Sequence, residues 1–283
     1  MLELLYIYLS FTQRISLPTR LTFMETTLTK KVNSAELEQK VKKMYSDVAT
    51  NPQGEYHFEM GRALAEKLGY SKNDLDLIPP ASIESFAGVG YYFDLVNLKE
   101  GERILDLGSG SGMDSFIAAI KVGKSGSVSG VDMTDEQLEK ANHLKNEYGF
   151  GNIHFHKSYI QQLAFAEGSF DAIISNGVIN LIPEKSRVFA EIVRVLRKGG
   201  RMCIADIVTE KQLPESITCN STLWASCIGG ASQLDDYRNL IEQAGMEIVT
   251  EKSNDTYSFI SKSAKGATKD YGVRSVSIHA QKK

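Results

Sequence analysis

The sequence predicts an α/β fold in which helices cover both faces of a seven-stranded, mostly parallel sheet behind a helical N-terminal cap. Three observations indicate this fold. From residue 103 onward, short apolar segments alternate with helical segments, a pattern typical of parallel strands joined by right-handed crossovers. The first apolar segment leads directly into a glycine-rich loop. The residues before this first apolar segment have apolar side chains at the spacing typical of helices.

The composition favours an ordinary globular protein. The 283 residues are 42% hydrophobic and 24% charged, enough for one large domain or a domain with a cap. The net charge is -3 and neither half carries a basic block, so neither a nucleic acid nor an anionic membrane is the expected partner. The odd, low count of three cysteines favours a reducing, cytoplasmic location over a disulfide framework.

Residues 1–33 are expected to be a flexible N-terminal extension. Residues 1–11 are apolar, but a bilayer span needs roughly 20 residues. No positive segment precedes them and no clear cleavage site follows, so a signal peptide is not favoured. Met24 begins a more ordinary start, which suggests a mis-assigned upstream start; a peripheral membrane anchor is the alternative interpretation.

Residues 34–95 are expected to form the helical cap. A first helix over residues 34–48, with Ser34 as its N-cap, places four apolar side chains at helical spacing, namely Leu37, Val41, Met44 and Val48. A second helix is expected from about Glu55 to Leu68, where Gly69 can end it. A proline break and a connection rich in glycine and aromatic residues follow, ending in a short helix.

Residues 96–283 are expected to form the sheet domain. The predicted strands are 104–107, 127–131, 153–156, 170–175, 201–206, 246–249 and 274–279. Three helices are expected between these strands. The first follows the glycine loop and ends at about Val122, the second runs from a capping box of Thr134 and Gln137 to Tyr148, and the third covers residues 183–196. The last strand is expected to be an antiparallel hairpin partner, and the segment before it is polar.

The glycine loop after the first strand reads GSGSG, with glycines at 108, 110 and 112. Such a loop lets the backbone approach a ligand, and the following helix offers free N–H groups. A dinucleotide fingerprint needs its third glycine one residue later, where this chain has Met113. Asp106 would also repel a pyrophosphate, whereas it suits an ammonium group such as that of S-adenosylmethionine. The loop therefore favours a Rossmann-like domain for this cofactor over a nicotinamide-dependent oxidoreductase.

Asp132 ends the second predicted strand. An acidic side chain at that place can accept hydrogen bonds from both ribose hydroxyls of a nucleoside. Together with Asp106, it makes a nucleoside ligand with a cationic tail the main prediction.

At this point the sequence resembles the class I methyltransferases. VSGVDMT resembles their ribose-binding strand end, HFHKSYIQQLAF resembles the segment that packs on adenine, and FDAIISNGVINLIP resembles their fourth strand and the loop after it. The resemblance implies an S-adenosylmethionine-dependent enzyme that methylates a small molecule. The cofactor-binding residues that it implies are Asp106, Gly108, Ser109, Gly110, Gly112, Asp132, Met133, Tyr159, Ile160, Ser175 and Asn176.

Within that superfamily, GSGSGMDSF, ISNGVINLIP and LPESITCNSTLWASCIGGA are similar to the arsenite methyltransferases. That family holds arsenic on cysteine thiolates, which suit a soft centre. Here Cys227 occupies a family cysteine position, Gly177 stands where the other main cysteine would be, and no cysteine precedes Cys203. Cys219, on the same or an adjoining helix, lies two helical turns from Cys227, or roughly 12 Å. Arsenite is therefore the alternative acceptor, and another small molecule is the main expectation.

Methyl transfer from a sulfonium is an in-line displacement that needs positioning and desolvation, with a base only if the acceptor carries a proton. Cys227, Asn176 and Asn180 are the candidate catalytic residues, because the two asparagines follow the fourth strand, where ligands bind. His57 is a possible base. No metal site is expected, and a cofactor-binding regulator without catalysis is a further alternative. An aromatic run could line the acceptor pocket or pack the cap, namely Tyr91, Tyr92 and Phe93.

Overall fold

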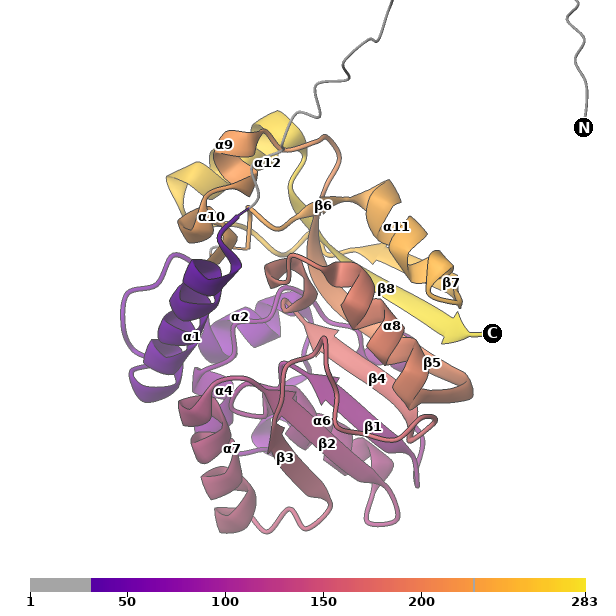
Figure 1. Ribbon diagram of the computed structural model, residues 1–283. Coiled ribbons are helices and arrows are strands. Elements are labelled where there is room, and N and C mark those ends of the chain that lie inside the picture. The colour runs from indigo at the N-terminus through magenta and orange to yellow at the C-terminus, as the bar shows by residue number, and fades with distance from the viewer. Residues whose placement is uncertain (1–31, 226) are drawn as a thin grey trace, which may run out of the picture. The chain divides into compact units, whose positions relative to one another are not determined.

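The computed structural model describes residues 32–225 and 227–283, and their centre is one mixed sheet (Figure 1). Its hydrogen-bonded order is β3-β2-β1-β4-β5-β8-β7, and β6 pairs with β5. The strands are β1 Arg103–Leu107, β2 Ser127–Asp132, β3 Ile153–Lys157, β4 Phe170–Asn176, β5 Leu196–Thr209, β6 Ser232–Gln233, β7 Met246–Ser253 and β8 Arg274–Lys282.

The strand directions confirm the predicted mostly parallel sheet. β1 to β5 pair in parallel, and β8 runs antiparallel to both β5 and β7. All seven predicted strands are present. β5 begins earlier than predicted, at Leu196, and β7 and β8 end later than predicted, at Ser253 and Lys282. The prediction lacks the two-residue β6, because a strand that short leaves no periodic pattern.

Side chains of the strands alternate between two buried clusters, one on each face of the sheet. In β1, Ile104 belongs to the first cluster, whereas Leu105 and Leu107 belong to the second. The first face is covered by α6 (Met113–Val122) and α7 (Asp135–Glu147), and the second by α8 (Lys185–Val195) and α11 (Leu234–Gln243). Both faces are therefore buried, which is why the central strands are almost entirely apolar.

The segment expected to form the cap, for which we keep that name, contains α1 (Ser34–Thr50), α2 (Gly61–Leu68), α3 (Lys72–Asp76), α4 (Pro80–Glu84) and α5 (Phe93–Val96). Its buried side chains belong to the same cluster as those of α6 and the first sheet face. The predicted N-cap Ser34 is wrong, because the Asn33 side chain accepts the first N–H groups of α1. The second helix begins later than predicted, at Gly61, and ends as predicted at Gly69, whose φ is 112°.

The predicted capping box of α7 is also wrong. Thr134 is the N-cap residue but makes no side-chain cap hydrogen bond. Gln137 turns into the protein instead, where its amide accepts from Ser111 Oγ (2.5 Å) and donates to the Tyr45 carbonyl (2.9 Å). Hydrogen bonds to residues distant in the sequence have therefore replaced the predicted capping box.

The remaining helices are η1 (Ile179–Leu181), α9 (Glu215–Thr218), α10 (Ser221–Ala225) and α12 (Lys262–Tyr271), and α10 packs directly on α1. Of these helices, α9, α10 and α12 lie together above α1 in Figure 1. α12 forms from the segment expected only to be polar, because Ser261 caps it and Ala264 and Ala267 are buried. None of the helices within the described ranges is long and apolar enough to cross a membrane. The interpretations of residues 1–31 lie outside the described residues.

The centre of the sheet generates a stability prediction. Ile173 in β4 is fully buried, so Ile173→Ala should lower the free energy of unfolding by about 2–5 kcal/mol through lost burial and a residual cavity. Urea unfolding followed by circular dichroism measures this change. Val249→Ala, at a side chain that is 54% exposed, is the control and should change stability by less than about 0.5 kcal/mol. Equal effects of the two substitutions would contradict the described core.

Candidate active site

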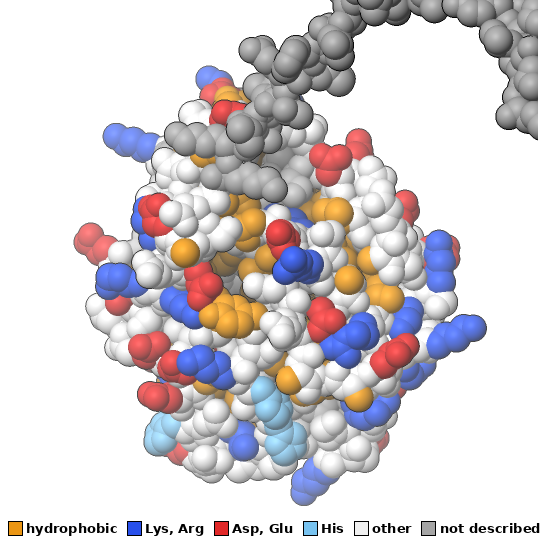
Figure 2. All heavy atoms as spheres, viewed as in Figure 1, with side chains coloured by type: hydrophobic (Ala, Val, Ile, Leu, Met, Phe, Trp, Pro, Cys, Tyr) orange, Lys and Arg blue, Asp and Glu red, His pale blue; other side chains and the backbone are white. Residues whose placement is uncertain are grey.

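A cleft opens where β1, β2, β3 and β4 end at their carboxyl sides. The empty space in it is about 960 Å³, a volume that includes open solvent. Figure 2 shows apolar side chains gathered around a hollow between α1 and α8. The cleft is lined by the glycine loop, the residues after β2, β3 and β4, and one face of α1. Ligands of open α/β sheets bind at this edge.

The glycine loop needs glycine for both conformation and space. Gly108, Gly110 and Gly112 all have positive φ, at 70°, 53° and 93°. A Cβ at Gly108 would lie 2.4 Å from Val178, and one at Gly112 would lie 2.8 Å from the Phe155 ring. The loop is thereby pressed against its neighbours, and its backbone lines the cleft.

Asp106 and Asp114 are two buried carboxylates beside this loop. Asp106 accepts a hydrogen bond from Ser115 Oγ at 2.6 Å, and burial together with the nearby charge of Asp114 raises its pKa to about 8. Asp114 accepts from the Tyr70 hydroxyl (2.7 Å) and the Tyr92 hydroxyl (2.6 Å). Burial raises the pKa of Asp114 as well, against these hydrogen bonds.

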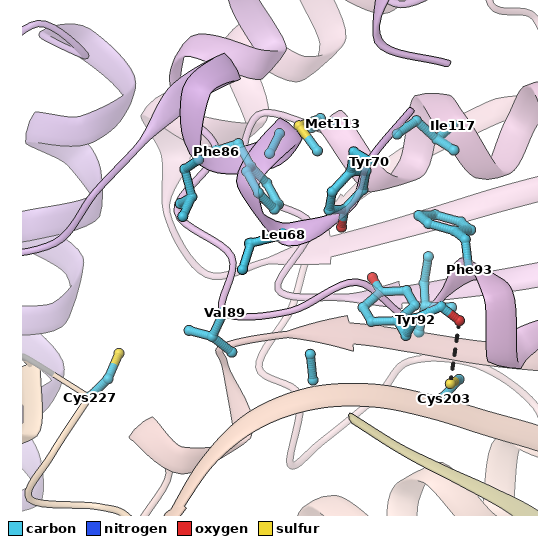
Figure 3. Close-up of a cluster of buried hydrophobic side chains, with 14 of the residues drawn as sticks. Leu68, Tyr70, Phe86, Val89, Tyr92, Phe93, Met113, Ile117, Cys203 and Cys227 are labelled. Atoms are coloured by element: carbon cyan, nitrogen blue, oxygen red, sulfur yellow. Dashed lines mark hydrogen bonds between the residues drawn. The ribbon is translucent and has the colours of Figure 1, made fainter. Parts of the chain in front are cut away.

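Sequence reasoning missed Asp114, although a signal existed. It is the second residue of α6, a helix most of whose residues are buried, and an acidic side chain there must find partners. Figure 3 shows Tyr70 and Tyr92 converging with their hydroxyls toward one place from two segments of the cap. The carboxylate of Asp114 is the partner that both share.

Asn176, at the end of β4, lines the cleft with its amide fully engaged. Its Oδ1 accepts from the Val89 N–H at 2.8 Å, and its Nδ2 lies 3.2 Å from Asp114 Oδ2 and 3.0 Å from the Gly90 carbonyl. The side chain therefore ties residues 89–90 of the cap to the cleft.

Asp132 lies at the opposite side of the glycine loop. Its two oxygens accept from the Gly110 N–H (3.0 Å) and the Thr134 N–H (2.9 Å). Burial is the largest influence on this carboxyl and raises its pKa. Each oxygen keeps a lone pair with which to accept a hydroxyl.

The helix α1 closes one side of the cleft through a small polar network. The Tyr159 hydroxyl donates to Glu38 at 2.7 Å, and Lys42 lies 2.7 Å from that hydroxyl and 4.9 Å from the ring centroid. Gln137 holds the Tyr45 backbone from the other side. The segment after β3 is thereby joined to α1 above the cleft.

A second, narrower space adjoins the cleft, and we call it the aromatic cavity. Its lining includes Tyr45, His57, Phe58, Cys227, Tyr257 and Phe259, and Tyr45 and Ala87 line both spaces. Cys227 has a positive φ of 61°, unusual for a residue with a side chain. Burial raises the pKa of its thiol to about 11, so the thiol is protonated at neutral pH.

Asn180 lies behind this thiol, in η1, and is completely buried. Its Nδ2 donates to the Cys227 carbonyl at 3.1 Å, and its backbone N–H donates to Asp206 Oδ2 at 2.9 Å. Burial raises the pKa of Asp206 to about 6, against a hydrogen bond from Tyr237. The network holds η1 against the loop that carries Cys227.

The predicted cofactor residues fall into two groups. Most of them line the cleft, but Gly112 and Ser175 do not. Gly112 is the N-cap residue of α6. Ser175 Oγ donates to the Leu107 carbonyl at 2.9 Å and so joins β4 to β1. The aromatic run lines neither space, and Tyr92 and Phe93 are buried in the cap core. Sequence reasoning missed cleft residues beside the predicted ones, namely Ser111, Asp114 and Gln161, and others on helices distant from the loop in the sequence, namely Tyr45 and Gln137.

The cleft suits a cationic nucleoside such as S-adenosylmethionine. Three carboxylates with raised pKa values line it, Asp106, Asp114 and Asp132, and an ammonium or sulfonium would compensate their buried charge. Two further lining atoms, Ser109 Oγ and Gln161 Oε1, are buried without a hydrogen-bond partner in the described chain, and a polar ligand would satisfy them. No cluster of metal-ligating side chains occurs among the residues that the structure describes.

Comparisons with known proteins agree with this site. Residues 98–245 match the family model described as a methyltransferase domain. An arsenite methyltransferase of Halobacterium salinarum is 38% identical over 185 residues, covering 65% of this chain and 47% of that protein. The human arsenite methyltransferase is 40% identical over 151 residues, covering 50% and 40%. The chain thus spans less than half the length of these curated relatives.

The crystal structure of an arsenic(III) S-adenosylmethionine methyltransferase from Chlamydomonas reinhardtii superposes with a TM-score of 0.62 at 33% identity, covering 74% of this chain and 72% of that one. The sheet order and the cleft at its carboxyl edge fit this likeness. The chain therefore belongs to the methyltransferase-domain family, in its class I S-adenosylmethionine-dependent branch, and it resembles the arsenite methyltransferases.

Proposed function

We propose that this chain transfers the methyl group of S-adenosylmethionine to a small-molecule acceptor by in-line displacement. The observation that carries the proposal is the set of acids around the glycine loop, of which Asp106 and Asp114 are buried and Asp132 is partly buried, because burying carboxylates without a cationic partner is costly. Asp106 would hold the ammonium end, Asp132 the ribose hydroxyls, and Tyr159 and Ile160 the adenine ring. When bound, the cofactor supplies an electrophilic methyl group on an already activated leaving group.

The chain's own residues then supply positioning and exclusion of water. Val41 and Tyr45 of α1 line the cleft, and the contact of Tyr159 with Glu38 and Lys42 closes that helix over the adenine side. The engaged amide of Asn176 keeps residues 89–90 in place beside the cleft. The acceptor would approach the methyl group on the side of the cleft that Tyr45 and Ala87 line.

Arsenite is a second candidate acceptor, favoured by the similarity of the chain to arsenite methyltransferases and by the place of Cys227 beside the cleft. The small number of cysteine thiols beside the cleft favours another acceptor. Cys203 lies buried in β5, with its sulfur 3.7 Å from the Tyr92 carbonyl (Figure 3), and Cys219 lines neither space. One thiol in reach offers a soft centre a single bond, whereas stable thiolate sites use several.

Asp106→Asn should weaken S-adenosylmethionine binding about 10- to 100-fold, because it removes a charge-assisted hydrogen bond of roughly 1.5–3 kcal/mol while keeping the side-chain shape. Isothermal titration calorimetry measures the affinity. Asp235→Asn, at a side chain that is 87% exposed on α11, is the matched control and should bind like wild type. Wild-type protein without cofactor binding would overturn the proposed function.

Turnover of methyl-labelled cofactor with a metabolite extract would separate an enzyme from a regulator that only binds the cofactor.

Cofactor affinity should rise with pH between pH 6 and 8 and level off above. The pKa of Asp106 in the free protein is about 8, so its carboxyl is protonated at pH 6, and a cationic ligand must displace that proton. Binding below pH 8 should therefore release up to one proton, with affinity falling up to about tenfold per pH unit as the pH drops. Calorimetry in phosphate and Tris buffers measures the proton release. A flat profile in wild type, or an unchanged one in Asp106→Asn, would contradict this assignment.

Arsenite should not be methylated above background, because only one thiol borders the reaction site. Mass spectrometry of arsenic species after incubation with S-adenosylmethionine measures this. Wild-type activity that is lost in Cys227→Ser and kept in the matched Cys219→Ser variant would establish the arsenite alternative. Cofactor affinity should stay within about twofold in both variants, since neither side chain lines the cofactor cleft.

A further inference from the structure

The helix α1 forms one wall of the cofactor cleft with few buried side chains of its own. Val41 and Tyr45 of α1 line the cleft. Four of the 17 residues of α1 are buried, whereas eight of the ten residues of α6 are. Elements with few buried residues and exposed hydrogen bonds are those that open most easily in a folded protein. The position of α1 therefore depends strongly on its polar contacts.

The first of these contacts lies at the exposed side of α1, and we call it the outer contact. The Tyr159 hydroxyl donates to Glu38 at 2.7 Å, and Lys42 donates to that hydroxyl at 2.7 Å and to Glu38 at 2.6 Å. Tyr159 lines the cleft, whereas Glu38 and Lys42 do not. The outer contact thus joins α1 to the side chain that is proposed to hold the adenine ring.

The second contact is buried, and we call it the inner contact. Gln137 of α7 is 2% exposed. Its Nε2 donates to the Tyr45 carbonyl of α1 at 2.9 Å, and its Oε1 accepts from Ser111 Oγ of the glycine loop at 2.5 Å. Both ends of one amide are therefore engaged, and the inner contact joins α1 to the glycine loop.

Both contacts end on residues that line the cofactor cleft, namely Tyr159, Gln137 and Ser111. A ligand that packs against Tyr159 and the glycine loop holds these side chains in place, and with them the groups that fix α1. A ligand stabilises the conformation to which it binds best, and closure over a ligand excludes water from the reacting groups. An occupied cleft should therefore favour α1 in its closed position.

We infer that Glu38, Lys42 and Gln137 are positioning residues that hold α1 closed over the bound cofactor, and that α1 opens to exchange S-adenosylmethionine for its demethylated product. This inference rests on the proposed function and adds the movement by which the same site exchanges its cofactor. Glu38 and Lys42 do not line the cleft, so they act on the cofactor through Tyr159 and α1. The outer contact should therefore control the rate of cofactor exchange.

The rate of cofactor dissociation from the full chain tests the outer contact. Combining Glu38→Ala with Lys42→Ala removes both partners of the Tyr159 hydroxyl and leaves the net charge unchanged. S-adenosylmethionine should dissociate about three- to tenfold faster from this variant, the loss expected for partly exposed charge-assisted hydrogen bonds. A chase of methyl-labelled cofactor with unlabelled cofactor, followed by rapid filtration, measures the rate.

The same helix offers a matched control. Lys43 and Asp47 form an exposed ion pair at 3.1 Å, with the same spacing as Glu38 and Lys42, and neither residue lines the cleft. Lys43→Ala combined with Asp47→Ala also leaves the net charge unchanged. This variant should release the cofactor at the wild-type rate, because the ion pair that it removes does not reach Tyr159.

Hydrogen exchange followed by mass spectrometry reports the movement of α1 directly. Saturating S-adenosylmethionine should slow exchange of the wild-type amides of residues 34–50 about tenfold more than those of α11, which covers the other face of the sheet. Gln137→Met, which removes the inner contact, should speed exchange in α1 relative to α11. If Gln137→Met does not fold, the wild type and the two variants with surface substitutions still decide.

Two results would overturn the inference. One is wild-type exchange in which the cofactor slows α1 no more than α11. The other is equal cofactor dissociation from the Glu38–Lys42 variant and from the Lys43–Asp47 control. Both are measured on protein that binds the cofactor, so they leave the proposed function standing, whereas a wild type that binds no S-adenosylmethionine would overturn the proposed function itself.

Discussion

The buried carboxylate of Asp114 is the interaction on which the rest of the site depends. It receives hydroxyl hydrogen bonds from Tyr70 and Tyr92 of the cap and lies within hydrogen-bond distance of the Asn176 amide at the end of β4. One charged group on the glycine-loop helix thereby joins the cap, the loop and the central strand. A buried charge is tolerated only when donors surround it, so this chain holds the cap in one register against the sheet.

The same carboxylate also sets the electrostatics of the cleft. Its charge adds to burial in raising the pKa of Asp106, so this carboxyl holds its proton to a higher pH than an exposed aspartate does. The acids of the cleft accept hydrogen bonds from protein groups and also line the empty space. Their negative charge therefore favours a positively charged ligand. The aromatic cavity next to it carries no charged lining residue among those described. The polar cleft and the apolar cavity meet at Tyr45, which lines both.

Much of the scaffold could be predicted because its signals are local. The glycine loop requires positive φ values at three closely spaced positions, and the apolar strands follow from burial on both faces of a parallel sheet. Predictions that relied on local motifs alone were less successful. Gln137 was expected to cap its own helix, yet it binds Ser111 and the Tyr45 backbone. The polar segment before β8 forms α12, because its small residues at helical spacing pack inward.

The sequence by itself determined the fold class, the approximate places of seven of the strands and the presence of Asp106, the glycine loop and Asp132 at one edge of the sheet, since carboxyl ends of parallel strands must meet there. Only the tertiary structure decided which distant residues complete the site. Asp114 meets Tyr70 across 44 residues of chain, and His57 and Cys227 reach one cavity from opposite ends of the sequence. The spacing of residue types along the chain does not predict these contacts, because the partners of a buried polar side chain depend on how the elements pack in three dimensions.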